Sequence, residues 1–379
     1  MEKNGVRIGM ASAYFATMKG GGEHYTLHLS NKLADLGYDI TIICGRQPLK
    51  KPEPLSDRFK VEYVPQLYFL RDWGMKRTKL ISGGAGFVHS YQYRLSCYRH
   101  LLKNHDFDVI HTHDPASLHA TVRIKRKYHV PIVSTFHGHP SSRHIEEVKN
   151  VDAILPVSKE IKSSFEKYGI KNVYDIPGGV DLSHFKPMNK DRCKEAIGLN
   201  GKVILFVGRL IPIKNLHNLL YAFKKMQSAV EDTKLLIVGD GVLKGELMRT
   251  AQKLGLNEKT IFTGAIDYEK MPTYYNAADV FVLPSIFESF PLVALEAAAC
   301  GVPLVISIGA KAFVEDFGED AIFKVDPKSV DSISNGIIQA LNDEVSKEKV
   351  ELSQSRIKKY SWLERAKKVA VIYEMVMSR

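Results

Sequence analysis

Short apolar runs alternate with longer amphipathic stretches along almost the whole chain. The apolar runs are rich in Val and Ile and show little alternation with polar residues, a pattern that is typical of strands buried on both faces. The stretches between them have the spacing of helices. In the first series, strands are predicted at 6–11, 40–44, 109–112, 132–136 and 154–157, and helices near 23–36, 86–104, 115–128 and 158–168.

A second series with the same alternation begins near residue 203. Its predicted strands are 203–207, 235–238, 261–263, 280–283 and 304–307, and its helices lie near 215–229, 243–254, 271–277, 291–300 and 329–342. Two such series predict an α/β protein with two Rossmann-like, doubly wound parallel-sheet domains. The ligand-binding edges of two such domains would face each other across a deep cleft.

A polar stretch at 184–200 predicts the boundary between the two domains. We therefore expect an N-terminal domain at 1–188 and a C-terminal domain at 189–360. The last helix, within 361–379, follows the complete second series, and we expect it to pack back on the N-terminal domain.

The composition is that of a globular protein. The chain has 379 residues, of which 45% are hydrophobic and 25% charged, which excludes disordered, collagen-like and multispan membrane proteins. No run of about 18 apolar residues could span a bilayer, and the N-terminus lacks the apolar core of a signal peptide. Cys44, Cys97, Cys193 and Cys300 lie far apart, which favours reduced thiols in a cytoplasmic protein.

The net charge of +11 is concentrated in the first half of the chain, above all in residues 66–103. This segment holds seven Lys and Arg residues against the single acid Asp72, with aromatic residues interleaved. Such a segment could meet an anionic membrane surface or an acidic ligand. An ordinary solvated face with core aromatics would have the same composition. No helix-turn-helix, zinc or RNA-recognition pattern accompanies it, so we expect no nucleic-acid partner.

Glycines open the first predicted helix, in the run Gly20-Gly21-Gly22-Glu23. Glycine lets a backbone approach a phosphate or sugar closely, and a helix N-terminus favours anions. The spacing is not that of the GxGxxG dinucleotide motif, and a run of glycines is equally compatible with a flexible turn.

Two cations follow the first strand of the second series, Arg209 and Lys214 in the run 207–215, which begins Val-Gly. A guanidinium and an ammonium at a strand end suit a diphosphate, the first as a fork and the second as a point charge. Taken alone, the same residues would be two surface charges.

Two carboxylates surround the start of a predicted helix. Glu288 precedes Ser289, Phe290, Pro291 and Leu292, and Glu296 lies two turns further on. We expect Ser289 or Phe290 to cap this helix and Pro291 to occupy its first turn. A carboxylate can accept two hydroxyl hydrogen bonds, which suits sugar and ribose diols. The alternative is a partly exposed Glu and a helix-face Glu, although Glu296 in an apolar run would be costly without a partner.

Histidines end two neighbouring strands, in His-Thr-His-Asp at 111–114 and in Phe-His-Gly-His at 136–139. Two HxH pairs could bind a metal, but no carboxylate cluster completes a ligand set, so we expect no metal site. The more favoured role for His137 is to line the cleft as a hydrogen-bonding imidazole. Asp106 and Asp108 form a DxD string that precedes a buried strand, and we interpret them as loop acids.

These residues resemble glycosyltransferase family 4, whose members have the GT-B fold. The resemblance spans nearly the whole chain in the order of the family, and its most specific part is the two-glutamate motif that runs into ALEA-ACG-P. The matching segments are GGGE at 20–23, DVIHTHDP at 108–115, STFHG at 134–138, DAILPVS at 152–158, IPGGVDLSHFKP at 176–187, FVGRLIPIKN at 206–215, LLIVGDG at 235–241 and DVFVLPSIFESFPLVALEAAACGVPLV at 279–305.

The resemblance implies transfer of a sugar from a nucleotide-diphosphate sugar, with UDP or GDP as the expected nucleotide, to a hydroxyl acceptor. It implies retention at the anomeric carbon, no obligatory metal and no cofactor. The C-terminal domain would bind the donor and the N-terminal domain the acceptor, a glycan, a lipid-linked sugar or a small molecule. An enzyme of this kind would be cytoplasmic, with residues 66–103 as a possible contact to the inner face of the membrane.

The resemblance also assigns roles to single residues. Arg209 and Lys214 would hold the diphosphate, Glu288 the hydroxyls of the transferred sugar, and Glu296 the ribose. Three of these residues, together with His137, form the expected catalytic set. That set is His137, Arg209, Lys214 and Glu288, and the donor-binding set is Gly21, Gly22, Gly208, Arg209, Lys214, Ser289, Phe290, Leu292 and Glu296.

The chain departs from the family pattern at three places. Gly178-Gly179 stands where Asn-Gly is usual, and Pro291, which has no N–H, stands where Gly is frequent. The loop that usually reads Gly-Gly-x-Pro-Glu is replaced at 309–313, where Phe313 takes the place of Glu and Lys311 adds a charge. This loop could alter recognition of the donor sugar or weaken the enzyme.

Three other functions remain open at this point. A nucleotide-sugar epimerase would convert the donor without an acceptor. A glycan phosphorylase would need phosphate and pyridoxal phosphate. A catalytically silent protein that binds a nucleotide sugar would retain the donor residues and lose the reaction, which the changed loop at 309–313 could indicate.

Overall fold

The computed structural model describes residues 5–13, 15, 21–46, 56–65 and 79–379, with the backbone alone for 79–90 and 143. The chain forms two compact units. Unit 1 contains residues 1–178 together with Trp362–Arg379, and unit 2 is Gly179–Ser361. The division therefore falls ten residues before the expected boundary at 188–189, because the intervening segment bonds to unit 2: the N–H of Val180 donates to the Tyr360 carbonyl at 2.8 Å.

Unit 1 is built on a six-stranded parallel sheet in the order β3-β2-β1-β4-β5-β6. Strands β4, β5 and β6 are buried along their whole length, which explains their continuous apolar sequence. The strands are β1 (Arg7–Ser12), β2 (Asp39–Arg46), β3 (Lys60–Pro65), β4 (Val109–Thr112), β5 (Ile132–Phe136) and β6 (Ala153–Pro156).

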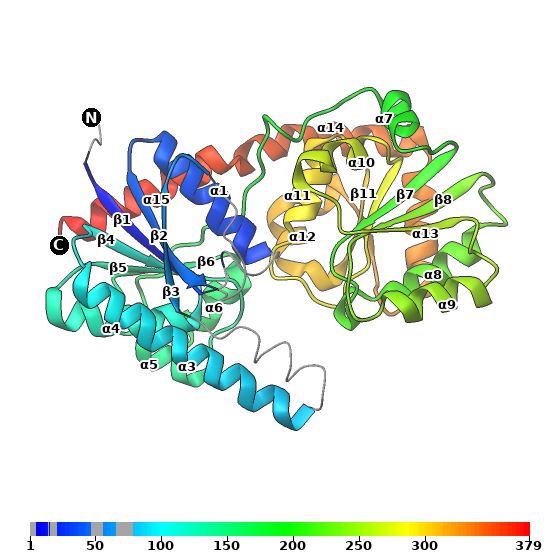
Figure 1. Cartoon of the computed structure of the whole chain (residues 1–379). Helices are drawn as coiled ribbons and strands as arrows, with labels where there is room; N and C mark the ends of the chain where they lie inside the picture. Colours follow the sequence, from blue (N-terminus) through cyan, green and yellow to red (C-terminus); the bar gives the residue numbers. More distant parts are fainter. Residues whose placement is uncertain (1–4, 14, 16–20, 47–55, 66–78) are drawn as a thin grey trace. The chain divides into compact units, whose positions relative to one another are not determined.

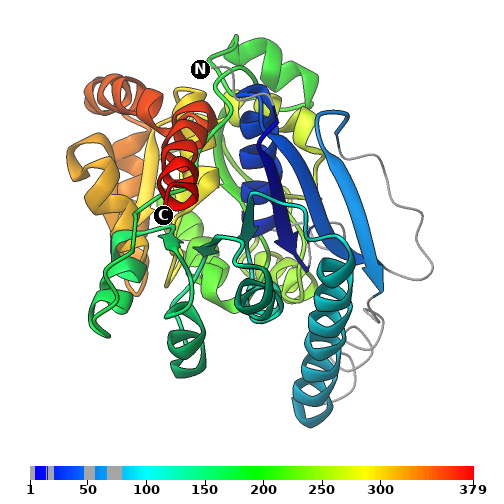
Figure 2. The same cartoon turned by 90° about the vertical axis from the view of Figure 1, so that its left-hand side faces the viewer.

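Helices cover both faces of this sheet. Helices α1 and α15 pack together on one face, and α3 and α4 pack together on the other (Figure 1). Figure 2 shows α3 lying beside β3, the outermost strand of the sheet. The helices are α1 (Gly21–Asp35), α3 (Lys79–Lys103), α4 (Pro115–Tyr128), α5 (Ser142–Val148), α6 (Lys159–Glu166) and α15 (Trp362–Met377).

Unit 2 repeats this topology. Its sheet has the order β12-β11-β10-β7-β8-β9, so that its first and fourth strands are also neighbours at the centre. The strands are β7 (Lys202–Val207), β8 (Thr233–Val238), β9 (Thr260–Gly264), β10 (Val280–Leu283), β11 (Leu304–Ser307) and β12 (Phe323–Val325). The two parallel sheets confirm the predicted α/β class with two doubly wound domains.

The helices of unit 2 again form two layers. Helices α8, α9 and α13 lie along one face, and α10, α11 and α14 along the other (Figure 1). The helices are α7 (Lys190–Ala196), α8 (Leu216–Met226), α9 (Lys244–Lys253), α10 (Met271–Asn276), α11 (Leu292–Ala299), α12 (Lys311–Phe317), α13 (Val330–Ala340) and α14 (Asp343–Ile357).

Each of the ten predicted strands is present to within two residues, and two further strands were not predicted. Strand β3 is an edge strand of half-exposed residues with two charges, and β12 has only three residues with an exposed Lys324 at its centre. Neither has the long apolar run that marked the central strands. In the described part of the chain, no helix is long and apolar enough to cross a membrane.

Candidate active site

In both sheets the strand order reverses between the first and fourth strands, which are β1 and β4 in unit 1 and β7 and β10 in unit 2. Ligands of open parallel sheets bind beyond the carboxyl ends of the strands at such a point, where the connections leave to opposite sides. Most of the candidate residues follow these strands directly. Gly208 and Arg209 follow β7, Glu288 comes shortly after β10, His113 follows β4, and His137 follows the next strand, β5.

The centre of the unit 2 site is an ion pair between Lys214 and Glu288. The Nζ of Lys214 lies 2.5 Å from the Oε1 of Glu288, and the two side chains are only 16% and 12% exposed. The Ser285 hydroxyl donates a hydrogen bond to the same carboxylate oxygen at 2.7 Å. The sequence analysis assigned Lys214 to the diphosphate and Glu288 to the sugar hydroxyls. The structure shows these two residues in contact with each other and with Ser285.

The loop that carries Lys214 is held in place by the next residue. Asn215 has a left-handed backbone with φ 59°, a conformation that Asn tolerates better than most residues. Its side-chain amide donates to the Pro284 carbonyl at 3.1 Å and to the Pro327 carbonyl at 2.6 Å. The amide therefore ties the end of the Lys214 turn to the segment that follows β10.

Arg209 is exposed, and its side chain has no hydrogen bond or ion pair with any of the described residues. The backbone next to Arg209 is closely packed. If Gly239 were replaced by a larger residue, the new Cβ would lie 2.0 Å from the Gly208 carbonyl oxygen. A Cβ on Gly208 itself would lie 3.9 Å from the Cε of Lys214. Arg209 is therefore a free cation on a fixed strand end, beside a Lys that is already paired.

Glu296 lies on the first two turns of α11 and is bonded to a neighbouring helix. The Tyr275 hydroxyl of α10 donates to its Oε2 at 2.6 Å. Burial raises the pKa of Glu296 to about 7, and the hydrogen bond from Tyr275 and the nearby His184 limit this rise. The sequence analysis expected an unpartnered Glu296 carboxylate to be destabilising. The structure gives this carboxylate a hydrogen-bond partner in Tyr275, and the group titrates near neutral pH.

The start of α11 differs from the prediction. Pro291 is the N-cap and Leu292 the first helical residue, so neither Ser289 nor Phe290 caps the helix. The ring of Phe290 packs on Phe313 with centroids 5.6 Å apart and on Tyr360. Ser289, Phe290 and Leu292 are all partly exposed, and the side chains of Phe290 and Leu292 pack against the core of unit 2.

The divergent loop at 309–313 supports Glu288. The Gly309 carbonyl accepts the Glu288 N–H at 3.0 Å, and a Cβ on Gly309 would lie 2.4 Å from the Ser285 carbonyl oxygen. Phe313 is fully buried, and Lys311 is exposed beside Glu315 at 3.7 Å. The Phe that replaces the usual Glu thus fills the core.

The unit 1 candidates gather around His137. A Cβ on Gly22 would lie 3.5 Å from the Cδ2 of His137, whereas a Cβ on Gly21 would meet nothing within 4 Å. The Tyr25 ring stands edge-on to His137, with centroids 5.0 Å apart. A Cβ at Gly22 would thus be in ordinary van der Waals contact with His137, and the helix start at Gly21 is open.

The three clustered histidines are neutral at pH 7. Burial lowers the pKa of His137 to about 4 and that of His111 to about 3, and it holds the pKa of His113 well below its ordinary value. No three His, Cys, Asp or Glu side chains form a metal-ligand group in the described ranges. Asp114 has a structural role, since it caps α4 and accepts the Ala13 N–H at 2.7 Å.

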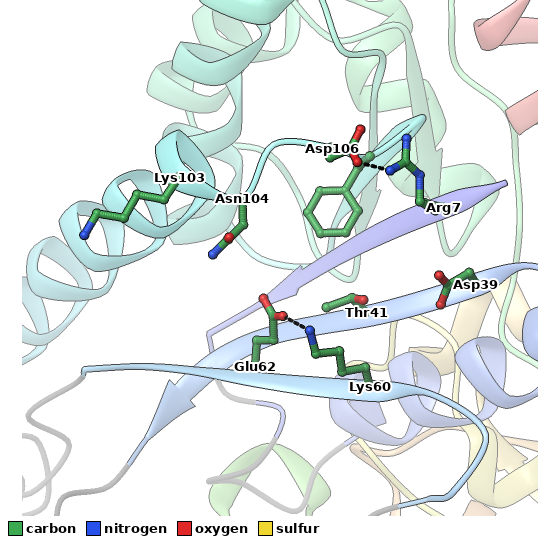
Figure 3. A pocket seen from close by; sticks show the side chains of 9 residues that line it. Arg7, Asp39, Thr41, Lys60, Glu62, Lys103, Asn104 and Asp106 are labelled. Atoms are coloured by element: carbon green, nitrogen blue, oxygen red, sulfur yellow. Dashed lines mark hydrogen bonds and ion pairs between the residues drawn. The ribbon is translucent and has the colours of Figure 1, made fainter. Parts of the chain in front are cut away.

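A pocket of about 280 Å³ opens at the opposite, amino-terminal edge of the unit 1 sheet (Figure 3). Four of its charged side chains form two ion pairs, Arg7 with Asp106 and Lys60 with Glu62. Asp108 accepts the backbone N–H of Arg7 at 2.7 Å. The two acids of the DxD string therefore close the loop onto β1, as loop acids do.

Part of the basic segment 66–103 lies outside the described residues, namely 66–78. In the described side chains of α3, Tyr93 and Cys97 are buried in unit 1, and the Tyr93 hydroxyl donates to the Ile43 carbonyl at 3.0 Å. Arg99 is exposed. These two apolar positions are ordinary core positions, while the role of the cations stays a prediction.

Two family models match consecutive parts of the chain. "Glycosyltransferase Family 4" matches residues 19–184, and "Glycosyl transferases group 1" matches residues 187–360. Together they cover both units and all of the candidate residues. An uncharacterized glycosyltransferase of Methanocaldococcus jannaschii is 29% identical over 92% of this chain and 93% of its own length.

A second relative has a stated activity. The UDP-Gal:alpha-D-GlcNAc-diphosphoundecaprenol alpha-1,3-galactosyltransferase of Escherichia coli is 28% identical over 91% of each chain. Among solved structures, Anabaena HepE in complex with UDP and glucose matches with a TM-score of 0.77 and 17% identity over 99% of this chain and 100% of its own. With both family models matched in sequence and a GT-B neighbour matched in fold, the chain belongs to glycosyltransferase family 4 and is a glycosyltransferase of the GT-B type.

Proposed function

We propose that this glycosyltransferase transfers a sugar from a nucleotide-diphosphate sugar to a hydroxyl acceptor with retention at the anomeric carbon. The observation that carries the proposal is the Lys214–Glu288 ion pair at the carboxyl ends of β7 and β10, beside the unpaired Arg209. HepE, whose structure contains UDP and glucose, supports a nucleotide-bound donor.

The cations suit the charge that develops in the reaction. The bond between the anomeric carbon and the diphosphate breaks, so negative charge grows on the leaving oxygen, while the acceptor oxygen forms the new bond and loses its proton. Arg209 and Lys214 are positioned to stabilise that charge electrostatically. Because Lys214 is fixed by Glu288 before any ligand binds, it needs little reorganisation.

The carboxyl groups suit the hydroxyls of the donor. In this proposal Glu288 accepts hydrogen bonds from the transferred sugar, Glu296 accepts them from the ribose, and His137 donates or accepts one at the sugar from unit 1. The intact donor residues do not favour a silent binding protein, and neither relative named above is described as an epimerase or a phosphorylase.

The donor site is tested by calorimetric binding of UDP and GDP to the wild type, Lys214→Ala and Lys225→Ala. Lys225 is a matched control, because it also pairs with a carboxylate, Asp331 at 2.6 Å, but both partners are more than half exposed. We expect one nucleotide to bind, with at least tenfold weaker affinity in Lys214→Ala and unchanged affinity in Lys225→Ala. Binding that is equal in all three proteins would contradict the proposed site.

Retention and metal independence need a separate experiment. The product formed with the nucleotide sugar that binds is examined by ¹H NMR at early times, with and without EDTA. We expect the anomeric configuration of the donor in the product and the same rate with EDTA. An inverted product would overturn the retaining mechanism, and loss of activity with EDTA would overturn metal independence.

For the acceptor we propose a glycan or a lipid-linked sugar that binds to unit 1. The Escherichia coli relative acts on a diphosphoundecaprenol-linked sugar, and residues 66–103 carry seven cations against one acid. Charge reversal at Arg71, Lys76 and Arg77 should abolish sedimentation with vesicles that contain anionic lipid. Sedimentation like that of the wild type would refute the membrane contact and leave the donor site untouched.

A further inference from the structure

Four polar side chains from four elements meet in the interior of unit 1, behind His137. They are Tyr25 of α1, His111 of β4, Thr135 of β5 and Tyr373 of α15, and none is more than 2% exposed. Nothing in the sequence linked Tyr373 to the site, since it lies 262 residues after His111. Polar groups this deeply buried need partners, and His111, Thr135 and Tyr373 supply them to one another.

Hydrogen bonds fix the imidazole of His111 at both ends. The Tyr373 hydroxyl lies 2.7 Å from its Nδ1, and the Thr135 hydroxyl lies 2.8 Å from its Nε2. The Tyr25 hydroxyl donates to the Ile176 carbonyl at 3.3 Å. One imidazole nitrogen must donate and the other accept, and because a hydroxyl can do either, the two hydroxyls together hold the ring plane whichever nitrogen carries the proton.

Ring contacts connect His111 with His137, which lies at the carboxyl edge of the sheet. His111 stacks on His113 with centroids 4.3 Å apart, and His113 lies nearly parallel to His137 at 6.3 Å. Both ring nitrogens of His113 are buried without a hydrogen-bond partner among the described residues. The His113 ring is therefore held by stacking on His111. The Tyr373 and Thr135 hydroxyls in turn fix the His111 ring.

A second set of ring contacts connects helix α15 with His137. Trp362, the first residue of α15, stands edge-on to Tyr25 at 5.1 Å, and Tyr25 stands edge-on to His137 at 5.0 Å. The Nε2 of His137 is itself buried without a partner among the described residues. The packing thus fixes the His137 ring and leaves one of its nitrogens for a ligand.

We propose that Tyr373 and His111 are positioning residues for His137, so that helix α15 sets the geometry of this candidate site residue of unit 1. This inference rests on the proposed function for its effect on catalysis. Removal of the Tyr373 hydroxyl leaves the His111 Nδ1 buried and unpaired, which frees the ring to rotate. His113 and His137 then lose the fixed surface behind them.

The test compares Tyr373→Phe with Tyr174→Phe. Tyr174 is a matched control, since its hydroxyl also contacts α15, at 3.4 Å from the Met375 sulfur, but it is half-buried and has no part in the His111 bonds. We expect Tyr373→Phe to lower kcat about tenfold, in keeping with the sensitivity of catalysis to small misplacements, and Tyr174→Phe to leave it unchanged. Nucleotide Kd should stay within twofold in both variants, because the proposed nucleotide residues lie in unit 2.

Imidazole ¹⁵N NMR gives a readout that does not depend on activity. In Tyr373→Phe the signals of both His111 and His137 should shift, and in Tyr174→Phe they should not. A shift of His111 alone, with kcat unchanged, would overturn the proposal. If the wild type transfers no sugar, the His137 signal still decides the positioning role, so failure of the proposed function is distinguished from failure of this inference.

A second pair of variants covers the case in which Tyr373→Phe does not fold. Thr135→Val removes the other hydroxyl that bonds His111, and Thr135→Ser keeps it. We expect Thr135→Val to lower kcat and move the His137 signal, and Thr135→Ser to restore both. Loss of kcat and a moved His137 signal in Thr135→Ser but not in Thr135→Val would show that methyl packing, and not the hydrogen bond, matters at this position, and would overturn the proposal.

Discussion

At the scale of single residues, Glu296 is a carboxyl group that changes charge near neutral pH. Its pKa of about 7 follows from burial, which opposes ionisation more than the bond from Tyr275 favours it. If the carboxylate accepts ribose hydroxyls as proposed, the ionised form is the one that binds. Nucleotide affinity should then rise as the pH increases through 7.

A Glu296→Gln variant tests this titration. The folded pKa lies above the unfolded value, so the native state binds the extra proton, and the stability that this contributes is lost as the pH rises through 7. Glutamine stays neutral, and its carbonyl can still accept from Tyr275. The variant should match the wild type in urea unfolding at pH 5 and exceed it by on the order of 2 kcal/mol at pH 8. A constant difference at all pH values would contradict the raised pKa.

The sequence pointed to single candidate residues but not to how they are arranged. Strand ends and the family motif identified Arg209, Lys214, Glu288 and Glu296. The Lys214–Glu288 pair joins residues 74 apart, and neither local pattern nor spacing reports such a contact. Tyr275 and Tyr373 were missed for the same reason, because a Tyr at an apolar helical position looks like any other core residue.

At the scale of elements, the loop after β11 shows how a changed motif can keep its role. Gly309 approaches the Ser285 and Ile286 carbonyl oxygens so closely that no side chain fits, and its own carbonyl holds the Glu288 N–H. Short elements such as α12 and β12 were not predicted from the sequence. They have few residues, and long-range contacts rather than periodicity fix their conformation.

A Gly309→Ala variant should therefore damage the site through the backbone. The added Cβ would lie 2.4 Å from two backbone oxygens, so the loop must shift and move Glu288 with it. We expect about 1–3 kcal/mol lower stability in urea unfolding, together with weaker donor binding. Gly245→Ala on α9 is the control, because a Cβ there meets nothing within 4 Å. It should be neutral or stabilising, and equal losses in both variants would refute the clash.

At the scale of the whole molecule, the buried histidines make unit 1 sensitive to acid. The pKa values of His111, His113 and His137 are all lowered by burial, so the unfolded chain takes up protons that the folded unit excludes. The stability they contribute is complete above their unfolded pKa near 6.5 and is lost as the pH falls towards 4. Unit 2 has no comparable group of histidines among its described residues.

His113→Phe should reduce this acid sensitivity, since a phenyl ring keeps the stacking and does not titrate. Each buried histidine adds a slope of up to about 1.4 kcal/mol per pH unit between its two pKa values. Thermal unfolding between pH 7 and 4 should therefore show a shallower fall of the unit 1 transition in the variant. The exposed His139 serves as control, and a slope that His139→Gln reduces equally would contradict the assignment to the buried group.

The return of the chain to unit 1 at Trp362 has a consequence for biosynthesis. All of unit 2 is translated before the helix that gives His111 its Tyr373 partner, across 262 residues of sequence. While the ribosome is still translating unit 2, one face of the unit 1 sheet lacks α15 and the histidine cluster lacks half of its enclosure. Unit 2, although second in sequence, is the first that a growing chain can complete, and an active site in unit 1 can mature only when translation has reached the last helix.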